Sequence, residues 1–571
     1  MGLHLFVPFS AKRPPAGGLR KALGPSWTRT PVRRAVQAAC LGTFLVLLLY
    51  VGKPFGARQW AEAFARREVV EAEAFLLLDP LVGVSAAMAA RTWTRALLPA
   101  AAVLGLCLIA PRVFCGYLCP LGTLIDLFDW AVGKRLGRWH LRPRGWWVHL
   151  RYLLLLAGLV AAAGGTLLAG FLAALPIATR GLAFAAGPLQ VGLMRGSPAV
   201  GPLTPAHFAG IVPLVIVCGL GLLGRRFWCR CLCPSGALLS LASLLRLTDR
   251  KVTSSCVECG RCAEACSFGA VRADFTTRPA DCTFCQECGA VCPTGAIQFV
   301  GRWKKLDLKA PHRPPPARAG VSRRGFLAGG LAATAAGLGI GRLFGLFRPA
   351  GAPAPVRPPG SVPERDFLRT CVRCGECVHS CPTGVLRASS LGAGPDGLWT
   401  PRADTDVSGC DPTCNLCGQV CPTGAIRALP LAEKRAARMG LAVVNEKTCL
   451  PWAGRQDCRM CVDACKSAGY EAIEFRLVRP ELDELGLPID GSGFLAPAVL
   501  ADKCVGCGLC QTRCNAVNVR AEGLLAEPAI SVHAGPGRED RIRRGSYRAL
   551  KRRRGRQEPG TEVDYAPDPP G

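Results

Sequence analysis

Four long apolar stretches, separated by polar loops, occupy much of the first 230 residues of the chain. They run over about 35–52, 96–113, 152–175 and 207–224. Each is close to the roughly 20 residues that an α-helix needs to cross the apolar layer of a bilayer. The pattern predicts an α-helical membrane bundle of four helices, within a membrane domain at 35–250.

A fifth apolar stretch lies at 322–347. It begins with the sequence SRRGFL at 322–327, which is typical of a twin-arginine export signal. Pro353 and Pro355 follow the small residues at which a signal peptidase would cut, so we expect an uncleaved anchor helix. The run GLGIG at 337–341 lies inside this helix without a preceding strand, so we interpret it as helix packing and expect no bound nucleotide.

Basic side chains are concentrated on one side of the predicted spans. A basic segment at 1–34 precedes the first span, whereas the loop at 176–206 carries only Arg180 and Arg195. Because positively charged loops stay in the cytoplasm, we expect both ends of the four-helix unit there, with 1–34 as a cytoplasmic N-terminal segment. No nucleic-acid-binding motif accompanies the net charge of +30. We therefore expect a lipid bilayer, and no nucleic acid, as a partner.

The second and fourth apolar stretches end in the same motif. It reads aromatic-C-x3-C-P-x-G-x-L, with Cys115 and Cys119 in the first copy and Cys229 and Cys233 in the second. Two similar helical hairpins side by side would bring both motifs to one membrane face. The four thiols then form a redox-active dithiol site, hold a metal, or only pack helix ends. We take them as the candidate catalytic residues, whereas Cys231 has no counterpart in the first copy.

Closely spaced cysteines follow the membrane domain, in a module at 251–300. Each run has the spacing C-x2-C-x2-C-x3-C, so that two residues separate the first three cysteines from one another and three residues precede the fourth. This run occurs twice. It is the ligand pattern of ferredoxins with two [4Fe–4S] clusters, in which the fourth cysteine of each run ligates the other cluster. Zinc is the alternative, although structural zinc sites usually come as separated C-x2-C pairs.

The region at 366–525 repeats this arrangement twice, with two departures. One residue is added between Cys410 and Cys414, and eight residues separate Cys449 from Cys458. The chain is therefore expected to hold six [4Fe–4S] clusters in small α+β modules like bacterial ferredoxins. The expected ligand sets are Cys256, Cys259, Cys262 and Cys292; Cys282, Cys285, Cys288 and Cys266; Cys371, Cys374, Cys377 and Cys421; Cys410, Cys414, Cys417 and Cys381; Cys449, Cys458, Cys461 and Cys514; and Cys504, Cys507, Cys510 and Cys465.

The remaining segments carry no such motifs. We expect linkers at 301–321 and 348–365, and a basic disordered tail at 526–571. The chain has no C-x2-C-H motif for covalent attachment of haem, so no haem is expected.

These motifs resemble two known families joined in one chain. Residues 1–300 resemble the NapH-type membrane subunit of periplasmic nitrate reductase systems, and residues 322–520 resemble the NapG- or MauM-type ferredoxin with its twin-arginine signal. The resemblance implies part of a quinol dehydrogenase in the bacterial inner membrane, with 251–300 in the cytoplasm and 366–525 in the periplasm. It would pass electrons from membrane quinol to a periplasmic redox partner, a cytochrome or a reductase such as nitrate reductase. The resemblance also implies that the C-x3-C-P cysteines take part in quinol oxidation.

Other functions stay open at this point. A copper-reductase-like assembly factor for cytochrome oxidase shares the C-x3-C-P membrane unit and a ferredoxin module, but needs neither the twin-arginine segment nor the second cysteine-rich region. A further alternative is the opposite direction of transfer, in which the chain carries electrons inward from a periplasmic dehydrogenase. Asp79, in the first outer loop, is a candidate for proton release from a quinol, with a solvated loop carboxylate as the simpler interpretation.

Overall fold

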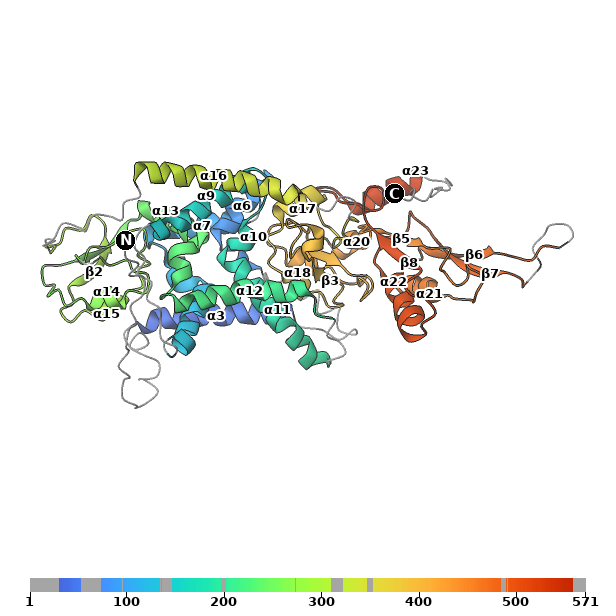
Figure 1. Ribbon diagram of the computed structural model, residues 1–571, viewed down its shortest axis with the longest axis horizontal. Coiled ribbons are helices and arrows are strands. Elements are labelled where there is room, and N and C mark those ends of the chain that lie inside the picture. Colours follow the sequence, from blue (N-terminus) through green and yellow to red (C-terminus); the bar gives the residue numbers. More distant parts are fainter. Residues whose placement is uncertain are drawn as a thin grey trace, which may run out of the picture.

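A bundle of helices lies in the middle of an elongated molecule, between two cysteine-rich parts (Figure 1). We call these parts the bundle, the module (248–309) and the distal region (353–557). The predicted segment before residue 30 and the linker residues 310–321 and 348–352 lie outside the described residues. The computed structural model describes residues 30–52, 73–94, 96–133, 135, 146–196, 202–272, 274–309, 322–346, 353–483, 489 and 491–557.

The bundle consists of helices of very different lengths. In the described part of the chain, two helices are long and apolar enough to cross a membrane, α3 and the continuous helix Pro205–Leu222. The elements of the bundle are α3 (Pro31–Val51), α5 (Ala74–Leu77), α6 (Pro80–Ala90), α7 (Leu97–Ile109), η2 (Phe114–Leu118), α8 (Pro120–Phe128), η3 (Asp129–Gly133), η4 (Trp146–His149), α9 (Leu150–Ala163), α10 (Ala169–Leu172), α11 (Ala174–Arg195), α12 (Pro205–Gly219), η6 (Leu220–Leu222), η7 (Trp228–Leu232), α13 (Pro234–Ala242) and η8 (Ser243–Leu245).

The other two predicted spans are shorter helices than their apolar stretches. α7 ends at Ile109 and α9 ends at Ala163. After α9, Gly165 has a φ of +88° and its N–H donates to the carbonyl of Ala162 at 2.8 Å. Glycine adopts this left-handed conformation without a steric cost, and the turn ends the helix. The structure therefore does not confirm a count of four spans.

Hydropathy also missed two helices, α6 and α11. Helix α6 packs through small residues: a Cβ at Gly83 would lie 2.6 Å from the carbonyl oxygen of Ala96, just before α7. Helix α11 contains Arg180, which is fully buried. Helix α6 is apolar but has only 11 residues, too few to stand out as a membrane span, and the buried Arg180 interrupts the apolar pattern of α11.

The module is a small α+β unit, as expected for a ferredoxin-type domain. Strands β1 (Thr248–Val252) and β2 (Ile297–Gly301) pair in an antiparallel sheet that joins its two ends. Between them, α14 (Arg261–Ala265) and α15 (Glu287–Ala290) each carry the third cysteine of a run.

The distal region contains three two-stranded antiparallel sheets, which pair β3 with β4, β5 with β8, and β6 with β7. Its core includes many of the cysteines of 449–514. Its elements are α17 (Glu364–Thr370), α18 (Glu376–His379), β3 (Leu386–Ala388), η9 (Leu391–Ala393), β4 (Pro401–Ala403), α19 (Leu416–Gln419), α20 (Leu431–Lys434), β5 (Leu441–Val444), α21 (Met460–Ser467), β6 (Ile473–Val478), β7 (Phe494–Val499), α22 (Leu509–Cys514), η10 (Asn515–Ala521), β8 (Ile530–His533) and α23 (Tyr547–Gln557).

The predicted disordered tail is wrong for residues 526–557. Strand β8 pairs with β5 and buries Ile530, and α23 begins at Tyr547, whose side chain is fully buried. Glu433 accepts hydrogen bonds at 2.7 Å from the Ser546 hydroxyl and from the backbone N–H of Tyr547. A carboxylate at a helix N-terminus satisfies its free N–H groups. Basic composition therefore conceals a folded segment here.

The predicted anchor segment forms helix α16 (Arg323–Leu346), which packs along α9. It begins toward the module and ends toward the distal region (Figure 1). Gly337 allows close packing, because a Cβ there would lie 2.6 Å from the carbonyl oxygen of Ala157. The interpretation of the glycine run as helix packing is thus confirmed at this residue.

Candidate functional site

Four small cavities in the module and the distal region are each lined by four cysteines. In every case three cysteines come from one run and the fourth from its partner run. The groups are Cys256, Cys259, Cys262 and Cys292; Cys371, Cys374, Cys377 and Cys421; Cys449, Cys458, Cys461 and Cys514; and Cys465, Cys504, Cys507 and Cys510. The eight-residue gap before Cys458 thus leaves Cys449 beside the other three. Binding of iron by these groups stays a prediction.

The cysteines of the other two expected sets also lie close together. Cys282 interacts electrostatically with Cys285, Cys288 and Cys266. Cys417 does so with Cys410, Cys414 and Cys381. All 32 cysteines are free of disulfide bonds. The structure therefore brings together six groups of four thiols.

Burial keeps many of these thiols protonated unless something replaces the proton. It raises the pKa of Cys282, Cys288 and Cys414 to about 12, because a thiolate loses its solvation there. Iron binds the thiolate form and releases the proton. In the described part of the chain, no three His, Cys, Asp or Glu side chains are placed to hold a single metal ion. Four thiols around a cavity fit a larger inorganic core, so these residues suit a [4Fe–4S] cluster.

Hydrogen-bond donors surround the sulfur atoms. Backbone N–H groups donate to Cys266, Cys421 and Cys465 Sγ at 3.2, 3.4 and 3.3 Å. Arg250 Nε donates to Cys288 Sγ at 3.3 Å. Such donors stabilise negative charge on sulfur and help to set the reduction potential of a cluster.

The two C-x3-C-P motifs have the same local structure. Cys119 precedes α8, and its Sγ accepts a hydrogen bond from Gly122 N–H at 3.4 Å. Cys233 precedes α13 in the same way, and its Sγ accepts from Gly236 N–H at 3.3 Å. In both copies a proline takes the first helical position, where it needs no hydrogen-bond partner. The second cysteine of each motif is thus a helix cap as well as a candidate redox group.

An arginine from each repeat completes the turn of the other repeat. Arg226 Nη1 donates to the carbonyl of Cys115 at 2.9 Å, and Arg112 Nη2 reaches that of Cys229 at 3.5 Å. Both arginines are buried and have positive φ values of 50° and 47°. Asp126 neutralises Arg226 through two hydrogen bonds of 2.7 and 2.6 Å.

The sequence holds a signal for these arginines that we did not use. Each lies three residues before the first cysteine of its motif, so the repeat extends to R-x-aromatic-C-x3-C-P-x-G. Both guanidinium groups lie over the ring of Phe268, 5.9 Å from its centre for Arg112 and 4.5 Å for Arg226. Phe268 comes from the module, two residues after Cys266, and places the module against both repeats.

The four thiols of the repeats form one group inside the bundle. Cys119 interacts electrostatically with Cys115 and Cys229, and Cys233 with the same two cysteines. The prediction that both motifs reach one end of the bundle therefore agrees with their contacts. Cys119, Cys229 and Cys233 are buried, and Cys115 is half-buried.

Asp79 is not a solvated loop carboxylate, so this interpretation is wrong. The side chain is completely buried and caps α6 by accepting a hydrogen bond from Leu81 N–H at 3.1 Å. It also accepts hydrogen bonds from Ser235 Oγ at 3.0 Å and from Leu175 N–H at 3.4 Å. A hydropathy pattern assigns an isolated carboxylate to a solvated loop. It cannot show that the hydrogen-bond donors which allow this carboxylate to be buried come from segments distant in the sequence.

The module docks on the first C-x3-C-P turn through the loop that carries Cys282 and Cys285. Tyr117 donates its hydroxyl hydrogen to the carbonyl of Phe284 at 2.8 Å. Arg151 pairs with Asp281 at 2.6 Å. These contacts place the loop beside the thiols of the bundle.

The distal region docks at the other end of the bundle. Arg180 Nη1 donates to the carbonyls of Gly170 and Arg373 at 2.9 and 3.0 Å, and its guanidinium lies 3.9 Å from the ring centre of Trp399. Arg373 Nη1 in turn donates to the carbonyl of Leu167 at 2.9 Å. The contact brings Cys374, next to Arg373, onto the bundle.

Replacing Gly170 by valine is expected to separate the distal region from the bundle. A Cβ at Gly170 would lie 2.6 Å from the carbonyl oxygen of Val372, where the backbone cannot move aside easily. Hydrogen exchange of residues 367–380 should speed up by about tenfold or more, since the docked surface opens. Gly158→Val is the control, because a Cβ there meets nothing within 4 Å. Unchanged exchange in Gly170→Val would contradict this docking.

Comparison with known proteins finds relatives in one functional class. The family described as "4Fe-4S binding domain" matches residues 92–138 and 206–252, so the internal repeat is confirmed. These two ranges contain the C-x3-C-P motifs. No solved structure matches the chain.

Several curated proteins are similar to parts of the chain. The methylamine utilization ferredoxin-type protein MauM of Methylobacillus flagellatus is 37% identical over 198 residues, 34% of this chain and 76% of the relative. The ferredoxin-type protein NapG of Escherichia coli is 34% identical over 217 residues, 37% of this chain and 84% of the relative. The putative electron transport protein YccM of Escherichia coli is 30% identical over 200 residues, 33% of this chain and 51% of the relative.

Proposed function

The chain belongs to the family of ferredoxin-type proteins that includes MauM and NapG, and from this premise we propose that it oxidises membrane quinol and delivers the electrons to a redox partner outside the cytoplasmic membrane. Its relatives carry electrons through iron–sulfur clusters, and this chain is an iron–sulfur protein of the same kind. The donor, the partner, the membrane and the number of clusters belong to the proposal.

Six [4Fe–4S] clusters, each held by one of the groups of four cysteines, would supply one-electron transfer. The four cysteine-lined cavities support this number, together with the two further thiol groups around Cys282 and Cys417. Arg250 and the backbone N–H donors are placed to stabilise the charge on such groups.

One observation carries the proposal: a single buried apolar core runs from the module to the distal region. It contains Phe268 of the module, the thiols of both repeats, and Val372 and Cys374 of the distal region. A dry, closely packed interior keeps the two cysteine-rich ends in fixed positions and excludes water between them. Such a core suits a protein that moves electrons along its length.

The length of α3 supports a position across the membrane. Near its start, Arg33 pairs with Glu287 of the module, and near its end the Leu48 carbonyl lies 3.1 Å from His379 Nε2 of the distal region. A helix of 21 residues is about 30 Å long, the thickness of the apolar layer of a bilayer. The module would then face the cytoplasm and the distal region the periplasm.

We assign the thiols of the two repeats to the path between the two ends. They lie beside the loop that carries Cys282 and Cys285, and Asp79 interacts with both Cys119 and Cys233. A serine at Cys119 or Cys233 would also cap the helix. Cysteine at these positions, next to the module, therefore suits a redox role in addition to the cap. This role replaces direct contact with quinol, because three of the four thiols are buried.

The decisive experiment is reduction of the anaerobic, oxidised protein by a quinol in lipid nanodiscs. Oxidation of a quinol to a quinone releases two electrons and two protons, so two one-electron acceptors and water complete the reaction. Iron–sulfur signals in electron paramagnetic resonance should appear on addition of quinol. No signal with quinol, and oxidation of the reduced protein by copper(II) instead, would favour the copper-reductase-like alternative.

The direction of electron flow has a second candidate, which the relatives suggest. MauM is named for methylamine utilization, so electrons from a periplasmic dehydrogenase are an alternative input. Quinone reduction by the chemically reduced protein, faster than its reduction by quinol, would favour that direction.

Export of the distal region is expected to depend on Arg323 and Arg324. In spheroplasts, an epitope at the C-terminus should be removed by added protease without permeabilising the membrane, because the folded distal region would lie outside. The Arg323→Lys, Arg324→Lys variant should protect the epitope, since export of a folded domain needs the paired arginines. Protection of the epitope in the unaltered protein would place the distal region in the cytoplasm.

A further inference from the structure

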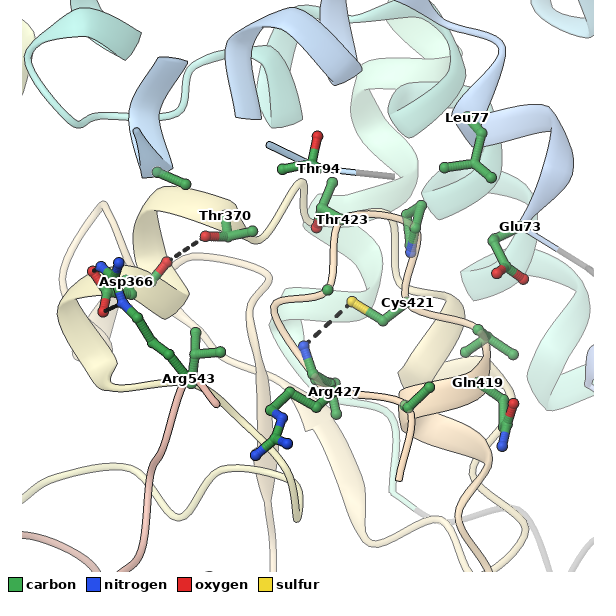
Figure 2. Close-up of a pocket in the computed structure, with 18 of the residues that line it drawn as sticks. Glu73, Leu77, Thr94, Asp366, Thr370, Gln419, Cys421, Thr423, Arg427 and Arg543 are labelled. Atoms are coloured by element: carbon green, nitrogen blue, oxygen red, sulfur yellow. Dashed lines mark hydrogen bonds and ion pairs between the residues drawn. The ribbon is translucent and has the colours of Figure 1, made fainter. Parts of the chain in front are cut away.

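A large cavity lies where the bundle meets the distal region, at the far end of α3 from the repeat thiols. Its volume is about 700 Å³. Glu73, Leu77 and Thr94 of the bundle face Gln419, Cys421 and Thr423 of the distal region across it (Figure 2). Cavities of a few hundred to about 1,000 Å³ are the size that binds small organic ligands.

The bundle contributes an apolar wall at the end of a candidate membrane helix. Tyr50 and Val51, the last residues of α3, line the cavity together with Leu77 and Ala90. Trp93 stands beside them with 93% of its side chain exposed. Tryptophan at a helix end is typical of the boundary between lipid and water. A ligand dissolved in the bilayer would reach the cavity at this level.

The distal region contributes a wall that the cavity shares with a cysteine group. Val420, Cys421 and Thr423 line both this cavity and the smaller one around Cys371, Cys374 and Cys377. Cys421 Sγ accepts a hydrogen bond from Ile426 N–H at 3.4 Å, which holds the thiol in this wall. A ligand in the cavity would therefore lie next to one of the six groups of four cysteines.

Two hydroxyl groups in the cavity lack a hydrogen-bond partner among the described residues. These are Thr94 Oγ1 from the bundle and Thr423 Oγ1 from the distal region, and both atoms are buried. Figure 2 shows Thr94 on the bundle and Thr423 on the distal region, and both line the cavity. A buried hydroxyl without a partner costs stability, and such groups usually bind a ligand or water. Glu73 adds a carboxylate to the same wall.

We propose that this cavity binds the quinol headgroup, with Thr94 and Thr423 as hydrogen-bond partners of its oxygen atoms and the apolar end of α3 against its ring and tail. The inference rests on the proposed function and gives the quinol a place in it. Quinol oxidised here would release its two protons to water and its two electrons, one at a time, to a cluster held by Cys371, Cys374, Cys377 and Cys421, which would pass the first electron to another cysteine-held cluster before it accepts the second. The site lies at the opposite end of α3 from Cys115 and Cys119, whose turn contacts Gln37 near the helix start.

Photolabelling with an azidoquinone tests this location without measuring turnover. In the cluster-loaded protein in nanodiscs, the label should appear in peptides from 73–94 and 416–428. Thr94→Val and Thr423→Val keep the shape but remove a hydroxyl, so each should weaken quinone binding by about tenfold. Leu77→Trp fills the cavity and should abolish labelling there. Thr179→Val is the control, since its hydroxyl is also buried without a partner in the described residues but lies outside the cavity.

The outcomes separate this inference from the proposed function. Labelling of peptides that contain 112–124 or 226–238, with quinol still reducing the protein, would overturn the cavity as the quinol site and keep quinol as the donor. Unchanged binding in both threonine variants and in Leu77→Trp would overturn it as well. If the unaltered protein is neither labelled by the azidoquinone nor reduced by quinol, the proposed function itself is overturned.

Discussion

Protein purified without oxygen is expected to contain about 24 iron atoms and 24 acid-labile sulfides per chain. Six groups of four cysteines, each with one [4Fe–4S] cluster, account for this number. Metal analysis and sulfide assay against protein concentration from amino-acid analysis are the measurements. Zinc as the main metal, or iron near half this value, would contradict six clusters. A value of about 28 would instead assign a further cluster to the four thiols of the repeats.

Removal of the iron is expected to unfold the distal region. One third of the buried residues in the core around 439–532 are cysteines, namely Cys449, Cys461, Cys465, Cys504, Cys510 and Cys514. Without iron, these thiols would surround empty space and pack weakly, and binding free energy at such sites is folding free energy. Circular dichroism after treatment with an iron chelator should show loss of the sheet signal, whereas a matched sample with chelator already saturated by iron should keep it.

Cys119→Ser and Cys233→Ser are expected to slow electron transfer between the two ends of the molecule by about 100-fold or more. Serine keeps the helix cap but is neither redox-active nor a good ligand for iron. Quinol should then still reduce the distal region, while the signals of the module remain oxidised in freeze-quenched electron paramagnetic resonance.

Cys231→Ser is the matched control for these variants. Cys231 lies in the same turn as Cys229 and is 2% exposed, but it has no counterpart in the first repeat. Its variant should transfer electrons at the unaltered rate. If Cys119→Ser and Cys233→Ser also reach that rate, the repeat cysteines serve only as caps of α8 and α13.

Cysteine spacing was the most informative part of the sequence. The distances between ligands are set by one short loop, so the runs predict which cysteines can meet, and the structure groups the cysteines of four cavities in that way. The eight-residue gap before Cys458 changed little, because the intervening residues form a turn in which Leu450 and Pro451 line the same cavity as the four cysteines. Hydropathy likewise predicted α3 and the helix at Pro205–Leu222, whose apolar residues are continuous.

The rest depends on contacts between distant segments. Asp79 is buried because Ser235, 156 residues away, and Leu175 cover it, and no local pattern contains this information. The cavity at the end of α3 joins residues near 73–94 to residues near 416–428. Its two threonines have no local signature, since a hydroxyl becomes a binding group only when folding leaves it buried and without a partner.

The exchange of Arg112 and Arg226 between the repeats has a consequence for the origin of the chain. Each arginine completes the turn of the other copy, so one copy alone would lack the guanidinium that contacts the carbonyl of its first motif cysteine. A single copy could make the same reciprocal contacts as a symmetric dimer, with the thiols around its twofold axis. Joining two copies in one chain would free them to differ, as they do at Cys231 and Asp126, each of which is present in only one copy.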